Sequence, residues 1–312
     1  MFPTLPRFEP PTDDSTSMKL ANDCLRKYFY RIILGRVPPK SKYQTVFDFG
    51  SAYHKFREVL EIEYTFNKLT QAQAFEKAIL AIKDMPLTPG VGKYEFYTRG
   101  RLMESCMSAF AWWQKEKADN NIEVIAVEQP FSLEMPDGRF ISGRADQIIK
   151  WKGRIWGRDF KTTSKEVKYF EATLDPNDQP IRYIFAESKL HFGDTAIADG
   201  KLISGIIFEV IQNTADTKSK KGYHGAISNV IVSKNHYQIK MWVQEQLFMN
   251  RVIKMAKDED TYPMQSHNCS FCDYHMVCKK PSEASMEYEL KANYKLSPWD
   301  PTKVEQVTFQ ET

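Results

Sequence analysis

Two aspartates and a lysine stand at a spacing that could build a hydrolytic metal site. Asp146 lies in the segment 143–161, GRADQIIKWKGRIWGRDFK, which ends with Asp159, Phe160 and Lys161. Side chains two positions apart in a β-strand point to the same face. We therefore expect Asp159 and Lys161 to lie side by side, with Phe160 turned into the core. Two carboxylates next to an ammonium group are typical of a site that binds a divalent cation near a phosphate.

The residues between the two aspartates predict a hairpin. Polar and apolar residues alternate over 147–151, Lys152-Gly153 is a turn signal, and the alternation resumes over 154–156. Such a hairpin would bring Asp146 back beside Asp159, and two hard oxygen ligands on adjacent strands suit Mg²⁺ or Mn²⁺. A neighbouring lysine can orient or deprotonate a water, or stabilise charge on a phosphate. The alternative is a pair of exposed strands with ordinary surface charges.

The cysteines indicate a second metal centre. The chain has five cysteines, and three of them follow the pattern C-x2-C-x5-C. These three are Cys269, Cys272 and Cys278. Two thiolates separated by two residues in a turn can bind one metal, and a site of soft ligands usually has four of them. Cys24 could supply the fourth, whereas His267 or His275 could complete a zinc site instead. An odd number of cysteines without a signal sequence argues against a disulfide framework.

Two helical segments could meet nucleic acid. The apolar spacing over 17–33 predicts a helix that Ser15 or Ser17 could cap, and its other face is basic and interleaved with tyrosines. The basic residues are Arg26, Lys27 and Arg31. This pattern suits a phosphate backbone with bases stacked nearby, although a solvated helix face has the same composition.

The second such helix is expected over 178–190, with Pro180 in its first turn. Gln179 and Tyr183 are four residues apart and share a face, and Arg182 adjoins it. Glutamine and tyrosine can both bond phosphate or base edges. The alternative is an ordinary amphipathic helix.

Two further residues are candidates for the metal site. His54 lies early in a helix expected over 45–63 and follows Gly50, where backbones could approach closely. A single helical histidine is more often a structural group than a ligand. Glu128 lies one strand before the strand of Asp146, and it is either another ligand or a charge at the end of a strand.

The remaining pattern predicts an α/β protein. Helices are expected over 68–84 and 98–118, a strand pair over 122–136 that starts an antiparallel meander, further strands over 202–214 and from 229, and a long helix over 236–257. The 312 residues are 42% hydrophobic and carry a net charge of +3, which neither announces nor excludes a nucleic-acid partner. The sequence has no long apolar run and no basic-then-apolar start, so we expect a soluble, cytoplasmic protein without membrane contact.

Taken together, these motifs resemble the RecB-like branch of the PD-(D/E)XK nuclease superfamily. The similarity is greatest to members with an iron–sulfur cluster, such as the CRISPR-associated exonucleases and the AddB-type helicase–nucleases. It covers most of the chain, in the order C-x-R-K-Y, G-x3-H, G-x2-D, D-x-K, Q-x3-Y and C-x2-C-x5-C. The matching residues are Cys24 to Tyr28, Gly50 with His54, Gly143 with Asp146, Asp159 with Lys161, Gln179 with Tyr183, and the three late cysteines. One departure is Leu25, where the family commonly has proline.

The resemblance implies a restriction-endonuclease-like core, a central mixed sheet flanked by helices, with extra N-terminal helices and a C-terminal cysteine region. It also implies a metal-dependent deoxyribonuclease, an exonuclease acting on single-stranded or end-frayed DNA. His54, Asp146, Asp159 and the Phe160 carbonyl would hold Mg²⁺ or Mn²⁺, with Glu128 as a further candidate. Lys161, Gln179 and Tyr183 would complete the catalytic set, and DNA would follow Arg26, Lys27, Arg31 and Arg182.

For the cysteines the resemblance implies a [4Fe–4S] cluster, while four thiolates alone suit zinc equally well. The implied domains are an arm over 1–16, a nuclease domain over 17–280 closed by that cluster, and a tail over 281–312. No G-x4-G-K-[ST] motif occurs, so a helicase, recombination or CRISPR-adaptation protein would be a separate partner, in a bacterial, archaeal or phage-infected cell. The alternative function is a non-catalytic nucleic-acid-binding subunit of such a complex, with a structural metal cluster.

Overall fold

The computed structural model of the protein describes residues 3–38, 44–119, 122–175, 177–213, 225–265, 269–270 and 272–301. The chain forms two compact units, and neither is continuous in sequence. Unit 1 comprises Met1–Ser41, Pro130–Gly143 and Lys240–Thr312, and unit 2 comprises Lys42–Gln129 and Arg144–Ile239.

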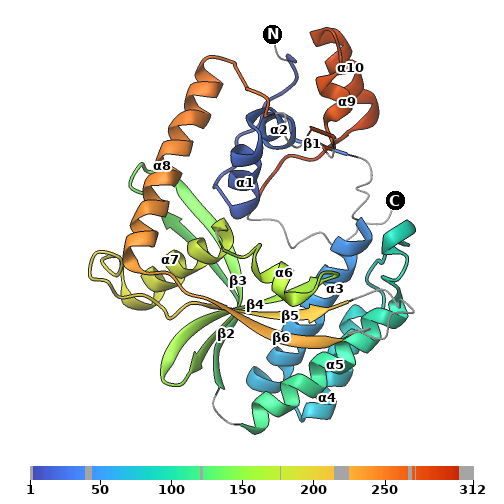
Figure 1. Ribbon diagram of the computed structural model, residues 1–312, viewed down its shortest axis with the longest axis vertical. Coiled ribbons are helices and arrows are strands. Elements are labelled where there is room, and N and C mark those ends of the chain that lie inside the picture. Colours follow the sequence, from blue (N-terminus) through green and yellow to red (C-terminus); the bar gives the residue numbers. More distant parts are fainter. Residues whose placement is uncertain are drawn as a thin grey trace. The chain divides into compact units, whose positions relative to one another are not determined.

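A five-stranded mixed sheet forms the centre of the α/β fold (Figure 1). Its strands are β2 (Ile122–Glu134), β3 (Phe140–Trp151), β4 (Arg154–Thr163), β5 (Ile206–Gln212) and β6 (Ala226–Val232), in spatial order β2-β3-β4-β5-β6. β3 pairs antiparallel with β4, β4 parallel with β5, and β5 antiparallel with β6. The parallel pair requires a crossover, which α7 (Asp178–Phe192) supplies. The expected mixed sheet flanked by helices is confirmed.

The hairpin between β3 and β4 forms as the sequence predicts. Lys152 and Gly153 take positive φ angles of 50° and 74°, the backbone that a two-residue hairpin turn requires. Pairing runs from Trp151 opposite Arg154 to Gln147 opposite Arg158. Asp146 and Asp159 follow directly beyond that last pair, on neighbouring strands.

Helices cover both faces of the sheet in unit 2. On one face lie α3 (Gln44–Glu61), which ends in a π-helical turn over Ile62–Phe66, then α4 (Gln71–Ile82) and α5 (Arg99–Ala118). They share a core with the sheet through Phe160 and Ile211. α7 lies on the other face, because Asp159 contacts α7 while its neighbour Arg158 contacts α5. A short 3-10 turn (Gly92–Tyr94) and α6 (Val167–Glu171) complete the unit.

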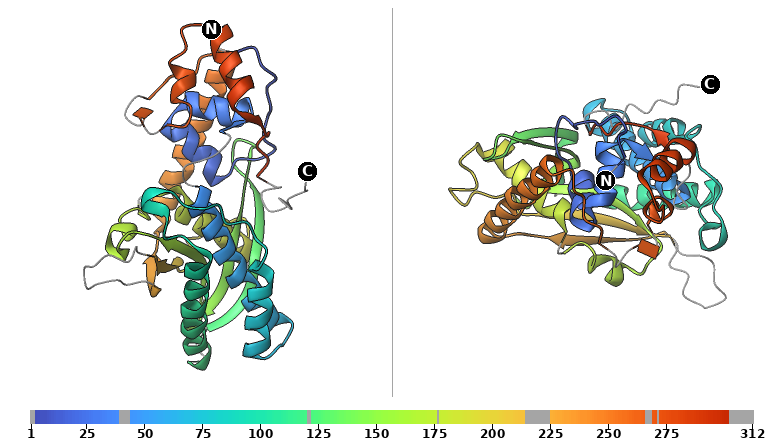
Figure 2. Two further views of the ribbon diagram at one scale, coloured as in Figure 1. Left: turned by 90° about the vertical axis from the view of Figure 1, so that its right-hand side faces the viewer. Right: turned by 90° about the horizontal axis from the view of Figure 1, so that it is seen from above.

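Unit 1 is built from segments far apart in sequence. Its helices are α1 (Ser15–Asp23), α2 (Leu25–Tyr28), a π-helical turn (Phe29–Ile33), the greater part of α8 (His236–Asp258), α9 (His275–Cys278) and α10 (Glu283–Asn293). The strands β1 (Arg36–Val37) and β7 (Lys295–Leu296) pair antiparallel. Figure 2 shows the N-terminal helices (blue) and the C-terminal helices (red) of this unit close together. Phe29 and Tyr30 of the π-helical turn pack against Tyr262 and Tyr274 in one core.

Three expectations about local structure were wrong. The helix expected over 17–33 is broken at Cys24, whose φ of −173° and ψ of 116° are extended. Its cap is Asp14, which accepts from the Ser17 amide in a capping box, so Ser17 lies inside the first turn instead of capping it. The strand pair expected over 122–136 is one strand, β2, in which Glu128 takes a φ of 54°.

The two ends of the sequence also contribute to unit 1. Leu5 lies in its core, and Asp13 bridges to Ile141 of β3. Beyond residue 280, α10 and β7 are ordered elements, and Leu290 is fully buried. Over the described residues, the helices all lack the length and apolar character that crossing a bilayer demands.

Candidate active site

Asp146 is the centre of a polar cluster in unit 2. Its Oδ2 atom accepts a hydrogen bond from the Phe160 main-chain amide at 2.8 Å and lies 3.0 Å from His54 Nδ1. His54 belongs to α3, whereas Asp146 and Phe160 belong to neighbouring strands. A single carboxylate oxygen therefore joins the helix and both strands of the hairpin.

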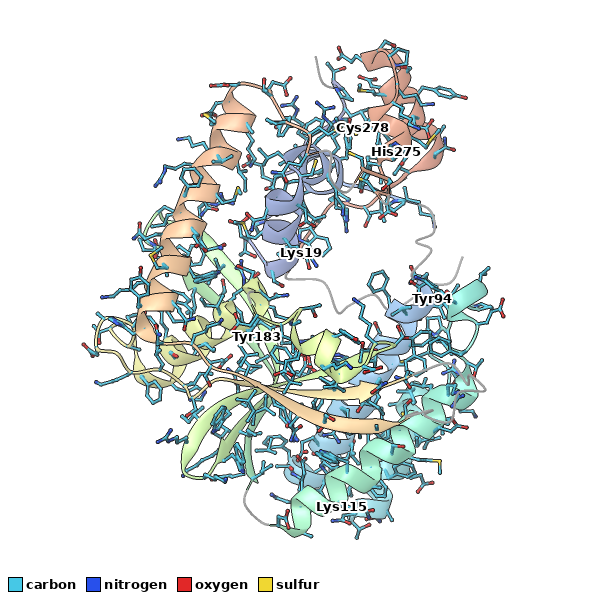
Figure 3. The ribbon with its side chains drawn as sticks, viewed as in Figure 1. Lys19, Tyr94, Lys115, Tyr183, His275 and Cys278 are labelled. Carbon is cyan, nitrogen blue, oxygen red and sulfur yellow. The ribbon has the colours of Figure 1, made fainter. Side chains whose placement is uncertain are left out.

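Asp159 forms the second half of the cluster. Its side chain is 1% exposed, and its Oδ2 lies 2.5 Å from Lys161 Nζ, so the two side chains share a face as expected. Gln179 Nε2 of α7 donates to Asp159 Oδ1 at 2.9 Å and to the Tyr183 hydroxyl at 3.3 Å. Tyr183 is largely buried (labelled in Figure 3). Gln179 thus orients the Asp159 carboxylate, and Tyr183 in turn orients Gln179.

The pKa shifts of Asp146, His54 and Lys161 show a strongly coupled ionic cluster. Burial opposes the charged form of all three, but the partner charges outweigh it. His54 lowers the pKa of Asp146, and Asp146 in turn raises the pKa of His54. Asp159 and Asp146 raise the pKa of Lys161, so this side chain is an ammonium group at neutral pH. It is therefore suited to stabilising negative charge, and not to deprotonating a water.

Two other carboxylates have raised pKa values. Burial raises the pKa of Asp159 to about 6, against the opposing charge of Lys161. Burial and the charge of Asp146 raise the pKa of Glu128 to about 7, and Arg144 Nε lies 2.5 Å from Glu128 Oε2. Glu128 is thus near enough to Asp146 for the charge of Asp146 to raise its pKa. The charge of Asp146 therefore disfavours the ionisation of both Asp159 and Glu128, and negative charge gathers around Asp146.

Gly50, which precedes His54 on α3, has room for a larger side chain. A methyl group added there would lie 3.7 Å from Thr162 Oγ1, which is an ordinary contact. The close backbone approach expected at this glycine is therefore wrong. His54 remains 32% exposed and meets the Phe160 ring edge-on at 6.3 Å.

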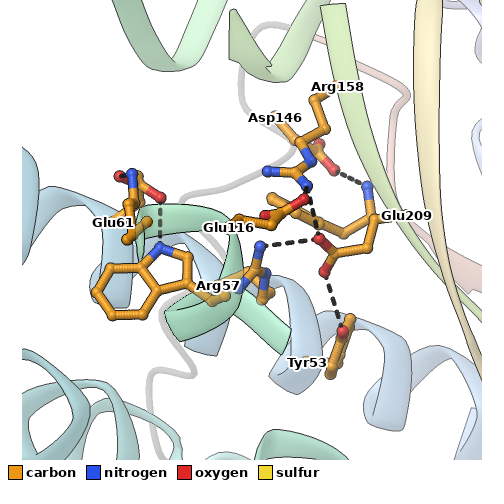
Figure 4. Close-up of polar contacts among 10 residues, drawn as sticks. Tyr53, Arg57, Glu61, Glu116, Asp146, Arg158 and Glu209 are labelled. Atoms are coloured by element: carbon orange, nitrogen blue, oxygen red, sulfur yellow. Dashed lines mark hydrogen bonds and ion pairs between the residues drawn. The ribbon is translucent and has the colours of Figure 1, made fainter. Parts of the chain in front are cut away.

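A buried ionic network lies on the opposite face of β4, and sequence reasoning missed it (Figure 4). Glu209 of β5 contacts Arg57 of α3 and Arg158 of β4, each at 3.0 Å, and the Tyr53 hydroxyl donates to it at 3.5 Å. Arg158 also pairs with Glu116 of α5. A signal did exist, because Glu209 is a lone charge inside the apolar strand IIFEVIQ. Such a charge must find a buried partner.

The four candidate cluster cysteines lie together in unit 1. Cys24, Cys269, Cys272 and Cys278 all line one cavity of about 210 Å³, and each is half-buried. His275 and Lys27 line the same cavity, and His275 and Cys278 both belong to α9 (Figure 3). Cys106 is fully buried in α5 of unit 2, where it packs as a small hydrophobic side chain.

Hydrogen bonds from Arg26, two residues after Cys24, attach this segment to residues 262 and 263. The Arg26 amide donates to the Pro263 carbonyl at 3.3 Å, and Arg26 Nε donates to the Tyr262 carbonyl at 3.2 Å. Burial raises the pKa of the thiols of Cys272 and Cys278, and the charge of Cys24 raises both further. Within the described ranges, no three or more His, Cys, Asp or Glu side chains are arranged to hold a metal ion. His267 lies outside those residues.

The basic residues expected to meet DNA have structural contacts. Arg31 Nη1 donates to the Ser297 carbonyl, and its guanidinium lies 4.6 Å from the centre of the Trp299 ring. Arg182 is 0% exposed and its Nε donates to Asp178 at 2.9 Å. A guanidinium without exposed surface cannot reach a DNA backbone unless the helix moves.

A comparison with protein-family models finds a match over most of the chain. The family model PDDEXK_1, described as the PD-(D/E)XK nuclease superfamily, matches residues 15–279. No curated protein matches the chain. Among solved structures the chain is similar to one titled "Crystal structure of SSO0001", with 14% sequence identity over 73% of this chain and 84% of that chain, at a TM-score of 0.31. A TM-score this low supports no conclusion, and the RecB-like branch stays a prediction.

Proposed function

The chain belongs to the PD-(D/E)XK nuclease superfamily, and from this premise we propose that it is a metal-dependent deoxyribonuclease. We propose that it hydrolyses phosphodiester bonds and acts as an exonuclease on single-stranded or end-frayed DNA. One observation carries the proposal. Asp146, Asp159, Lys161 and His54 come from two strands and a helix, and they converge on one partly buried cluster.

The donor set of this cluster fits Mg²⁺ or Mn²⁺. Two aspartates, with Glu128 close by, offer the carboxylate oxygens that hard cations prefer, and His54 adds an imidazole that Mn²⁺ accepts. The raised pKa values of Asp159 and Glu128 support the fit, because a bound cation would offset both causes of these shifts, the burial of the two carboxylates and their repulsion by Asp146. We propose Asp146, Asp159, His54 and the Phe160 carbonyl as the ligands, with Glu128 as a further candidate.

When bound, the divalent ion polarises the scissile phosphate and lowers the pKa of a bound water. The chain's own residues supply the remaining steps in the proposal. Lys161 keeps its proton and stabilises the negative charge that develops on the phosphate. Gln179 fixes the Asp159 carboxylate through its 2.9 Å bond, and Tyr183 in turn fixes Gln179. The Phe160 amide and His54 orient Asp146.

The test is degradation of uniformly labelled DNA. Linear single-stranded, linear duplex and circular DNA are incubated with the purified chain and Mg²⁺ or Mn²⁺. We expect release of labelled nucleotides from linear DNA, none from circles, and loss of this release in Asp146→Ala. Asp199→Asn, a surface carboxylate outside the cluster, should cleave as the unmodified chain does. Metal-dependent DNA binding without cleavage would favour the non-catalytic alternative.

For unit 1 we propose that the four cysteines hold a [4Fe–4S] cluster, with Zn²⁺ as the alternative ion. The support is that four thiols from opposite ends of the sequence line one cavity, and four thiolates suit either group. Such a centre would join α2 to the segment around α9 and would remove unfolded-state entropy by closing a long loop.

Iron, sulfide and zinc analysis after anaerobic purification decides this second proposal. We expect about four iron and four sulfide per chain, with loss of both in Cys272→Ser. Cys106→Ala is the matched control, because this fifth cysteine lies in the other unit and should leave the metal content unchanged. Stoichiometric zinc without sulfide would show that the cysteines hold zinc and not an iron–sulfur cluster. A chain with neither iron nor zinc would refute the proposed metal centre.

A further inference from the structure

Glu209 is the point at which three elements of unit 2 meet. It lies on β5 directly opposite Phe160 in the β4–β5 register and is 0% exposed. Its Oε2 contacts the Nη2 atoms of Arg57 and Arg158, each at 3.0 Å. The Tyr53 hydroxyl donates to Oε1 at 3.5 Å. Both carboxylate oxygens therefore contact α3, and Oε2 contacts β4 as well (Figure 4).

The partners of Glu209 are the sequence neighbours of the proposed site residues. Tyr53 directly precedes His54 on α3, and Arg57 follows His54 by three residues, within one helical turn. Arg158 directly precedes Asp159 on β4. One carboxylate thus ties the helix that carries the imidazole to the strand that carries the aspartate and the lysine.

Phe160 carries this connection to Asp146. The centre of its ring lies 4.5 Å from the Arg57 guanidinium carbon and 5.8 Å from that of Arg158. The main-chain amide of the same residue donates to Asp146 Oδ2. A shift of either guanidinium would move the ring, the amide and then the Asp146 carboxylate.

Burying these charged side chains costs free energy, which indicates that the network positions neighbouring groups and does not mainly stabilise the fold. Buried ion pairs are seldom more stabilising than apolar side chains of the same shape, because the charges lose their hydration. Arg57 Nε and Nη1 are buried without a hydrogen-bond partner among the described residues, which adds to that cost. A hydrolytic site, in contrast, requires its groups to be held within about 0.5 Å.

We propose that Glu209 is a positioning residue of the hydrolytic site. It holds α3 and β4 in one fixed relation, so that His54, Asp146 and Asp159 meet around the same cation. The inference rests on the proposed function for its consequence in catalysis, and on the contacts of Glu209 alone for its consequence in structure.

The test compares Glu209→Gln with Glu187→Gln. Glutamine keeps the shape of Glu209 but removes the charge that two guanidinium groups share. Glu187 is equally buried in the same unit, and its neighbour is His191 at 3.6 Å, so it controls for the loss of a buried carboxylate. Three quantities are measured on the full chain: kcat and KM on linear DNA, Mn²⁺ affinity by titration calorimetry, and amide hydrogen exchange of a peptide spanning 157–163 without metal.

For Glu209→Gln we expect kcat to fall by about 10- to 100-fold, as for a misplacement of about 1 Å. The KM for DNA should stay unchanged, Mn²⁺ should bind more weakly, and exchange over 157–163 should be faster, with none of these effects in Glu187→Gln. If Glu209→Gln does not fold, Arg57→Lys keeps the charge and should change the same quantities in the same direction.

Unchanged Mn²⁺ affinity and exchange in the folded variant would overturn the inference. Equal losses in the two glutamine variants would also overturn it, since they would indicate a general stability effect. If the unmodified chain cleaves no DNA, the proposed function fails, and the exchange comparison still decides whether Glu209 positions the strand.

Discussion

Replacing Asp159 by asparagine should abolish cleavage and at the same time stabilise the folded chain. Asparagine has the volume of aspartate and keeps an oxygen that can accept from Gln179. It lacks the charge that the site requires to hold a cation. Asp159 is 1% exposed, so its charge is poorly solvated, and burial is the main cause of its raised pKa.

The size of the stabilisation follows from that shift. The pKa rises from 3.8 in the unfolded chain to about 6 in the folded one. At about 1.4 kcal/mol per pKa unit, the ionised carboxylate costs the folded state about 3 kcal/mol at neutral pH. This cost is already net of the favourable contact with Lys161, because that contact lowers the folded pKa from which the cost is worked out. The gain in the asparagine variant should therefore be about 3 kcal/mol.

The sign of the pH dependence follows from the same linkage. An acid with a raised folded pKa binds its proton more tightly when folded, so the stability of the unmodified chain falls as pH rises from about 4 to about 6 and is then constant. At pH 5 the cost of the ionised carboxylate should be about half its value at pH 7.5. The advantage of the asparagine variant should shrink accordingly.

Urea unfolding in the presence of a chelator measures these differences, with Asp199→Asn as the surface control. Added Mn²⁺ should reverse the order, because a metal at 1,000 times its dissociation constant stabilises the unmodified chain by about 4.1 kcal/mol. A variant no more stable than the unmodified chain at pH 7.5 would refute the electrostatic reasoning. A variant that still cleaves DNA would refute the site.

Four other changes test separate parts of the proposals. Lys161→Met should lower kcat by about 100- to 1000-fold while DNA binding persists, because it removes a charge that acts on the transition state; kinetics and a binding titration measure this. Gln179→Ala should lower kcat by about 10- to 100-fold through loss of its bond to Asp159. Cleavage should rise with pH through about 7, where Glu128 ionises, and a pH–rate profile of Glu128→Gln should be flatter. Cys24→Ser should lower the metal content of the protein and its melting temperature, measured by elemental analysis and calorimetry.

Each of these predictions has a contradicting result. Loss of DNA binding in Lys161→Met would make this residue a DNA contact, and full activity of Gln179→Ala would remove its orienting role. An unchanged pH profile in Glu128→Gln would exclude Glu128 from the site. Equal metal content in Cys24→Ser and Cys106→Ala would exclude Cys24 as a ligand.

The parts of the site that sequence predicts best are those with local causes. Alternation of polar and apolar residues fixes which side chains share a face, and the Lys152-Gly153 turn fixes the register of the hairpin. Together they bring Asp146 beside Asp159. Gln179 and Tyr183 share a helix face for an equally local reason, the four-residue spacing.

The parts that sequence reasoning misses depend on distant partners. Helical periodicity runs through Cys24, and the break there comes with hydrogen bonds to Tyr262 and Pro263, more than two hundred residues away in sequence. Arg57 has the appearance of a surface charge on α3 until Glu209 of β5 is placed beside it. No local pattern contains these pairings.

The discontinuity of unit 1 has a consequence for synthesis on the ribosome. Once residue 239 has left the exit tunnel, every segment of unit 2 is available for folding. Unit 1 has by then only its first helices and the short piece 130–143, and it still lacks α8, α9 and α10. The nascent α1, α2 and the π-helical turn carry aromatic residues such as Tyr28 and Phe29 that the finished unit buries, and these residues lack their packing partners until α8, α9 and α10 have been synthesised. Apolar surface exposed during this interval makes a chain prone to aggregation.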